Sequence, residues 1–265
     1  MTRVRALSWR PLSFVFVVCA FFGSAEPVAA WTPNSQVLLG EHAVRVAPGD
    51  FRKQLEKHMD EFRRGLRDPF RLAAAEFHER NLDSGRLHEA LRQEIERTIA
   101  MIKALRPFEQ VAYQAGVVVH YVNDLNNPLN CDRRDASEGQ YYADYLRYLE
   151  STEDRLEYLF YGLSPTLDAG EIDAFIEERL GRCREVYPMV GKEYRRIGKL
   201  PGTRYFDDRS TAFGVSGVSH SRAITDAALV LRHIWIAAGG EDWRQAPAES
   251  EGRYFRVERE ATTRP

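Results

Sequence analysis

The chain has 265 residues, with 37 basic and 39 acidic side chains and a formal net charge of −2 at pH 7. A chain this close to neutral does not hold a nucleic acid by charge alone, although metal ions can neutralise phosphates locally. Because 44% of its residues are hydrophobic, it can build one large core or two small ones.

Residues 1–30 have the features of a cleavable secretory signal. Arginines precede an apolar run at 12–23, and small residues at 27–30 follow it. A membrane anchor is the alternative, but the run is shorter than the ~20 apolar residues that cross a bilayer. We expect cleavage before Trp31, which makes the mature protein secreted or periplasmic.

Hydrophobic spacing is helical along nearly all of the remaining chain, and no segment alternates as a strand does. Apolar residues three or four apart, with caps and breakers, predict helices over 51–66, 84–105, 108–126, 138–151, 168–187, 188–197 and 221–238. The stretch 198–219 has no periodicity and predicts a long loop. We therefore predict an all-α fold, with a single compact multi-helix domain over 31–243 and a polar tail at 244–265.

His120 and Asp124 carry the clearest chemical signal. They lie four residues apart in one predicted helix, so both project from the same face and can bind one ion. A histidine that follows three valines is, however, more often a hydrogen-bonded core residue than a ligand. The pair alone is therefore only a weak indication of a metal site.

Residues 116–130 read GVVVHYVNDLNNPLN. This His-x-x-x-Asp-x-x-x-Pro-Leu pattern, Trp31 at the predicted mature terminus and the scattered single histidines resemble the zinc-dependent phospholipase C and S1/P1 nuclease superfamily. The resemblance extends from Trp31 through the segment around His78 to the last predicted helix. The interval from Trp31 to His42 is closer to the bacterial phospholipase C branch. The resemblance implies an all-α domain of this type.

The first zinc ion that the resemblance implies would bind the α-amine and carbonyl oxygen of Trp31 together with His42. Asp124 would bridge from this ion to a second one. A free amine can lose its proton and bind zinc, whereas the peptide nitrogen of an uncleaved chain cannot. Export would therefore complete the site.

The second implied zinc ion would bind His78, His120 and Asp68 in addition to the bridging Asp124. Imidazole and carboxylate are good zinc ligands. Asp68 is also the match for the family's aspartate that orients or deprotonates the attacking water. The interval from Asp68 to His78 is shorter than is usual in the family.

The third zinc site of the family is degraded in this sequence. The family has a histidine directly after Pro-Leu, and then a histidine and an acid four residues apart. Here Asn130 stands at the first position, and the best match for the later pair is Gln140 and Asp144. Amide oxygens are poor zinc ligands. We expect the third site to be empty or much weakened.

The chain beyond residue 30 has two cysteines, Cys131 and Cys183. Three interpretations remain open at this point. The two residues form a disulfide in an oxidising compartment, or they are two buried thiols, or Cys131 acts near a metal.

The resemblance favours an exported zinc-dependent phosphoric-ester hydrolase, most similar to a phospholipase C, in which metal-activated water attacks a phosphodiester. The expected partners are a phospholipid or another phosphodiester and, transiently, a membrane surface. No stable nucleic-acid complex is expected. The alternatives are a catalytically weak or inactive member that binds a phospholipid head group or a partner, a single-strand nuclease, and a metal-free helical scaffold.

Overall fold

The computed structural model describes residues 31–79 and 84–242. The predicted signal at 1–30 and the tail at 244–265 lie outside the described residues. The described part of the chain consists of α-helices and short 3-10 helices without any strand, which confirms the all-α prediction. None of its helices is long and apolar enough to cross a membrane.

The helices follow one another with short connections. Their bounds are α1 Pro33–Val46, α2 Gly49–Lys57, α3 Met59–Arg67, α4 Pro69–Leu72, η1 Ala75–Phe77, α5 Leu87–Lys103, α6 Phe108–Leu125, α7 Glu138–Thr152, η2 Glu153–Arg155, α8 Pro165–Asp168, α9 Ile172–Ile197, η3 Thr203–Tyr205 and α10 Thr211–Ala237.

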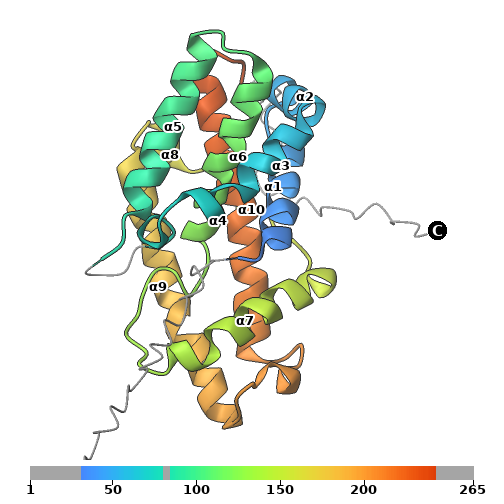
Figure 1. Cartoon of the computed structure of the whole chain (residues 1–265), viewed down its shortest axis with the longest axis vertical. Coiled ribbons are helices and arrows are strands. Elements are labelled where there is room, and N and C mark those ends of the chain that lie inside the picture. Colours follow the sequence, from blue (N-terminus) through green and yellow to red (C-terminus); the bar gives the residue numbers. More distant parts are fainter. Residues whose placement is uncertain (1–30, 80–83, 243–265) are drawn as a thin grey trace, which may run out of the picture.

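Helices α6 and α10 form the centre of the molecule (Figure 1). Helix α6 packs against α3 and α5, while α10 packs against α1, α6 and α9. Both central helices are buried along most of their length, with Val118, Val122, Val230 and Leu231 fully inaccessible. A polar side chain on α6 or α10 therefore needs a partner inside the protein, because water does not reach it.

Two helix predictions need correction in the first two-thirds of the chain. The predicted helix over 51–66 is divided into α2 and α3 at His58, whose backbone leaves the helical region (φ −117°, ψ 39°). Helix α1 was not among the predicted elements. It begins at a proline, and the side chain of Thr32 caps it by accepting a hydrogen bond from the Ser35 amide.

Two further corrections concern the C-terminal part. The predicted helices over 168–187 and 188–197 are one helix, α9, which continues through Pro188. The predicted loop over 198–219 is wrong from Thr211 onward. Ser210 accepts a hydrogen bond from the Phe213 amide and caps α10 there, ten residues before the predicted start.

Helices α3 and α6 approach each other unusually closely. A Cβ atom at Gly65 would overlap the Tyr113 carbonyl oxygen, and one at Gly116 would overlap the Phe62 carbonyl oxygen. Two glycines therefore allow the backbones to touch. This contact brings the end of α3 against the middle of α6, where His120 lies.

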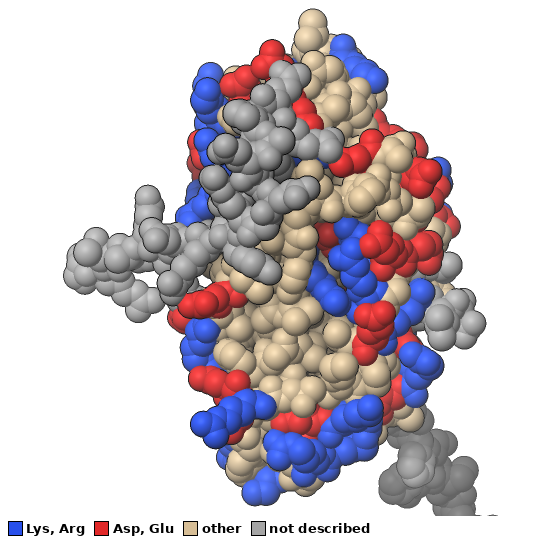
Figure 2. Space-filling view, turned by 180° about the vertical axis from the view of Figure 1, so that it is seen from behind, with Lys and Arg blue, Asp and Glu red and all other residues tan. Residues whose placement is uncertain are grey.

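Charges of both signs are interspersed on the face that Figure 2 shows, with a broad uncharged area between them. No large surface of one sign is visible on this face. This distribution agrees with the nearly neutral composition of the chain.

Candidate metal site

Three ligand atoms meet between α6 and the segment after α4. Nδ1 of His78 lies 2.7 Å from Oδ2 of Asp124, and Nε2 of His120 lies 3.2 Å from the same oxygen and 3.1 Å from Nδ1 of His78. All three side chains are buried. Within residues 31–79 and 84–242 they are the one group of three or more metal-ligating side chains whose ligand atoms come within 4.8 Å of one another.

Backbone carbonyls orient both imidazole rings. Nδ1 of His120 lies 2.7 Å from the carbonyl oxygen of Leu66, and Nε2 of His78 lies 3.3 Å from that of Pro69. When the proton of a neutral ring is on the nitrogen that faces a carbonyl, the nitrogen that faces Asp124 can offer its lone pair to a metal ion. Metal-binding histidines typically have this arrangement, because the outer hydrogen bond fixes tautomer and ring orientation.

The electrostatics of the cluster favour a positive charge at its centre. Burial tends to lower the pKa of His78, but the hydrogen bond and charge of Asp124 outweigh burial and hold this pKa above its ordinary value. Burial also opposes ionisation of Asp124, yet the two histidines keep the pKa of Asp124 below its ordinary value. A proton or a metal ion can supply the positive charge.

The residues fit a single zinc ion. Two imidazoles and one carboxylate are common zinc ligands, and three protein ligands leave a fourth coordination position open. Asn130 lies against the cluster, because its Nδ2 donates to the carbonyl oxygens of His78 (2.8 Å) and Asp124 (3.3 Å). Oδ1 of Asn130 is buried and has no hydrogen-bond partner among the described residues. This acceptor is not used by the described residues.

Aromatic rings surround the two histidines. The ring of Phe70 meets that of His120 edge to face at 4.7 Å and lies parallel to that of His78 at 6.3 Å. The ring of Tyr121 lies 5.4 Å from His120 and 5.8 Å from His78. Such an apolar shell limits the access of water and strengthens electrostatic interactions inside it.

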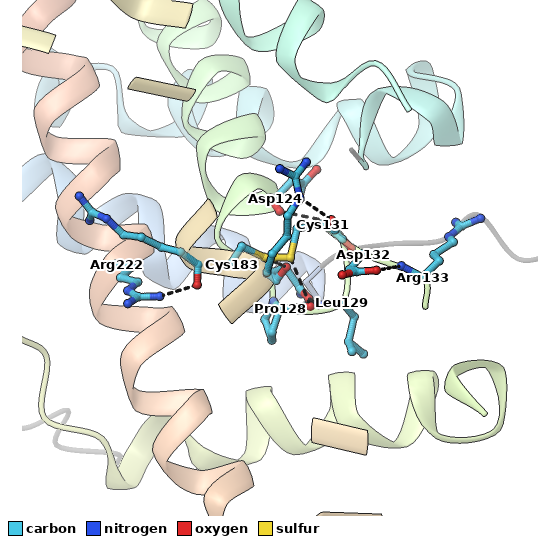
Figure 3. Close-up of a disulfide and its surroundings, with 12 residues drawn as sticks. Asp124, Pro128, Leu129, Cys131, Asp132, Arg133, Cys183 and Arg222 are labelled. Carbon is cyan, nitrogen blue, oxygen red and sulfur yellow. Dashed lines mark hydrogen bonds between the residues drawn. A yellow bond between two sulfur atoms is a disulfide. The ribbon is translucent and has the colours of Figure 1, made fainter. Parts of the chain in front are cut away.

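The disulfide interpretation of the cysteines is confirmed. Cys131 and Cys183 are bonded to each other and connect the segment after α6 to α9 across 52 residues. Figure 3 shows Asp124 next to this disulfide. Because both sulfurs are in the bond, Cys131 does not act as a metal ligand in this state. The bond also fixes the chain directly after Asn130.

Asp68 lies outside the three-residue cluster. Its carboxylate is 3.0 Å from Nη2 of Arg71 and accepts a hydrogen bond from the Tyr113 hydroxyl at 3.1 Å. The backbone on either side of Asp68 does contact the cluster. The carbonyl oxygen of Leu66 faces the ring of His120, and that of Pro69 faces the ring of His78. A role of Asp68 as zinc ligand or base stays a prediction.

Neither Trp31 nor His42 belongs to the three-residue cluster. The buried indole of Trp31 donates from Nε1 to the Asn123 carbonyl oxygen at 2.7 Å. The ring of His42 packs against Tyr158, with ring centroids 4.9 Å apart. The coordination of zinc by the Trp31 amine and His42 stays a prediction.

The three residues matched to the third zinc site do not come together. Asn130 contacts the cluster, whereas Gln140 is exposed on the surface. The carboxylate of Asp144 accepts hydrogen bonds from the Tyr194 hydroxyl and from the amides of Gly202 and Thr203, so it holds the segment around η3.

Sequence reasoning missed Gln36, which donates from Nε2 to Oδ1 of Asp124 at 2.8 Å. It also missed Phe70, although an aromatic residue directly after Asp68-Pro69 is visible in the sequence. No local pattern marks Gln36, because its partner lies 88 positions away on another helix.

No family model matches the chain, and no curated protein matches it. Among solved structures, the alpha toxin from Clostridium absonum resembles the chain with a TM-score of 0.49 and 16% sequence identity. The likeness covers 81% of this chain and 65% of the toxin chain, so this chain spans just under two thirds of the toxin's length.

Proposed function

We propose that the mature chain is an exported, zinc-dependent hydrolase of phosphoric esters, most similar to a phospholipase C. The observation that carries the proposal is the convergence of Nδ1 of His78, Nε2 of His120 and Oδ2 of Asp124 on one buried point. Catalytic zinc sites typically have three protein ligands and an open fourth position, whereas structural sites have four. The motif resemblance supplies the substrate class.

A zinc ion bound there would polarise a phosphoryl oxygen and lower the pKa of a bound water. The chain's own residues prepare the site for this chemistry. The Leu66 and Pro69 carbonyls hold both rings in the ligating orientation, and Phe70 excludes water from one side. Oδ1 of Asn130 is buried without a hydrogen-bond partner among the described residues, so it could accept a hydrogen bond from a water or hydroxyl group held beside the cluster.

Arg133 supports an anionic substrate. Its guanidinium pairs with the carboxylate of Glu79, which directly follows His78 in the chain, and its side chain is half exposed. Guanidinium groups bind phosphate oxygens in bidentate fashion. Arg133 is therefore our candidate for holding a phosphoryl group beside the metal.

The test is a turnover assay on protein that is secreted with its own signal. The substrates are a choline phosphodiester, phosphatidylcholine vesicles and single-stranded DNA, each with and without a chelator. We expect cleavage of the choline phosphodiester that the chelator and the substitution His120→Gln both abolish. Preferential cleavage of DNA would identify a nuclease instead.

One observation favours a second candidate, a family member that binds its ligand without turnover. His120 and Asp124 are fully inaccessible, and Phe70 packs against both imidazoles. A metal in so closed a site can serve stability alone. Bound zinc without turnover of any of the three substrates would reject the enzymatic proposal and support this one.

A further inference from the structure

The two carboxylate oxygens of Asp124 face different partners. Oδ2 faces the two histidines, whereas Oδ1 accepts a hydrogen bond from Nε2 of Gln36 at 2.8 Å. A bridging carboxylate would instead use its second oxygen to bind a second ion. The side of Asp124 toward α1 is therefore occupied by an amide group of the protein itself.

The direction of the Gln36 amide is fixed by its neighbours. Its Oε1 accepts a hydrogen bond from Nδ2 of Asn123 at 2.7 Å, while its Nε2 also lies 3.5 Å from the His120 carbonyl oxygen. Turning the amide over would place its Oε1 against Oδ1 of Asp124, so that two acceptors would face each other. It would also place Nε2 against Nδ2 of Asn123, so that two donors would face each other. Gln36, Asn123 and Asp124 are all fully buried, so water cannot relieve such a conflict.

Trp31 and His42, the other two residues of the first implied zinc ion, have different contacts. The ring of His42 packs on Tyr158, and the ring of Trp31 packs edge-on against His220 at 4.7 Å. His42 lies six residues after Gln36, which places it on a different face of α1 from the side chain that reaches Asp124. The described side chains thus gather one group of ligand atoms, at His78, His120 and Asp124, and neither the Trp31 indole nor the His42 ring belongs to it.

We infer that this chain holds one metal ion rather than two, and that Gln36 takes the place of the ion implied at Trp31 as the partner of Asp124. The inference rests on the proposed metal-dependent function. The amide N–H groups carry partial positive charge, so they compensate the second carboxylate oxygen without a second cation. Gln36 is thereby a positioning residue, which holds Asp124 with Oδ2 turned toward the two histidines.

The direct test is the zinc content of two forms of the protein. One form is secreted with its own signal and begins at Trp31, and the other has a methionine before Trp31 that blocks the amine. We expect one zinc ion per chain in both forms. Two ions in the secreted form would overturn the inference and leave the hydrolase proposal standing, whereas no zinc in either form would overturn both.

Substitutions separate the roles of the side chains by metal affinity, without recourse to activity. Gln36→Met removes the donor to Asp124 at similar volume, and we expect a roughly 10–100-fold loss of zinc affinity with an unchanged stoichiometry of one. Gln114→Met is the matched control, because Gln114 is a buried glutamine on α6 that donates to Glu94. If Gln36→Met binds zinc as tightly as this control does, Gln36 does not position Asp124.

His42→Gln gives an independent answer. A one-ion site predicts the same zinc content for this variant as for the unaltered protein, since His42 is not part of the three-residue cluster. A fall from two ions to one on this substitution would show that His42 is a ligand. Far-UV circular dichroism checks that each variant is folded before its metal is counted.

Discussion

At the scale of single residues, His78 and His120 have both ring nitrogens committed, one to a backbone carbonyl and one to the cluster. His120→Gln keeps a polar side chain but offers an amide, which is a poor zinc ligand. We expect its zinc affinity to fall by more than the roughly 10–100-fold that losing an outer-shell partner costs.

The control for this substitution is His88→Gln on α5, where the side chain is 30% exposed and lies outside the cluster. Its zinc affinity, measured by competition with a chromogenic chelator, should equal that of the unaltered protein. Similar losses in the two variants would contradict the assignment of His120 as a ligand.

The buried carboxyl group of Glu138 predicts how the stability of the protein depends on pH. Burial raises its pKa to about 7, and its Oε2 has no hydrogen-bond partner in the described part of the chain. Because the folded state holds this proton more tightly than the unfolded state, whose carboxyl has the usual pKa of 4.5, folding stability falls as the pH rises from about 4.5 to about 7.

Glu138→Gln removes the ionisation and should therefore stabilise the protein above pH 7. We expect a gain of about 1–3 kcal/mol there, nearer the lower value because the side chain is partly exposed, and little difference at pH 4. Thermal unfolding of both proteins at pH 4 and pH 8 measures this. A stabilisation of the same size at both pH values would show that the charge of Glu138 is not its cause.

At the scale of elements, the contact of α3 with α6 connects the fold to the site. The close approach at Gly65 and Gly116 brings the Leu66 carbonyl to within 2.7 Å of Nδ1 of His120. Gly65→Ala would force the Tyr113 backbone away, and overpacking of this kind costs about 1–3 kcal/mol. We expect this variant to lose both stability and zinc affinity.

Gly181→Ala on α9 is the matched substitution, because nothing lies within 4 Å of the added Cβ atom. Alanine is the better helix former, so this variant should be more stable by roughly 0.5–1 kcal/mol. Urea unfolding and zinc titration of both variants test the pair. Unchanged zinc affinity in Gly65→Ala would mean that the Leu66 carbonyl does not control the orientation of His120.

The helices also show which parts of the fold the sequence could predict. Helices α5, α6 and α7 were predicted with bounds close to those observed, because each has a regular apolar stripe and a proline or a glycine near an end. Pro188 suggested a boundary, but Tyr187 and Val190 are buried on α9, so tertiary packing maintains the helix through the proline. The true start of α10 depends on the hydroxyl cap of Ser210 in a stretch without periodicity.

At the scale of the whole molecule, the Cys131–Cys183 disulfide closes a loop that contains α7 and the N-terminal part of α9. A crosslink of this span stabilises a protein by about 2–4 kcal/mol, mainly through the unfolded state. We expect reduction to lower the melting temperature and also to weaken zinc binding, since Asn130 next to Cys131 holds the backbone of His78 and Asp124.

The double variant Cys131→Ser, Cys183→Ser provides the control. It should have the lower melting temperature from the start and show no further change with a reductant. Calorimetry of both proteins with and without the reductant gives the answer. A reductant effect of equal size in the double variant would mean that some other group responds to it.

For the site, the sequence could place two ligands on one helix face, because the spacing of His120 and Asp124 is local information. It could relate His78 to them only through a family resemblance, since 42 positions separate His78 from His120. The partners that complete the site could not be predicted. Gln36, Phe70 and the Leu66 carbonyl reach the cluster because α1, α3 and α4 pack around α6, and that packing is a property of the whole fold.

The use of carbonyl oxygens from residues 66 and 69 to orient both rings has a consequence for evolution. A carbonyl group is the same whatever side chain its residue carries, so positions 66 and 69 can change in sequence without losing the hydrogen bonds to His120 and His78, provided that the backbone path is kept. Among descendants of this chain, divergence at these two positions would not signal loss of the metal site. Substitution of Gly65 or Gly116 would signal such a loss, because a side chain at either position would overlap the backbone of the facing helix and change the backbone path.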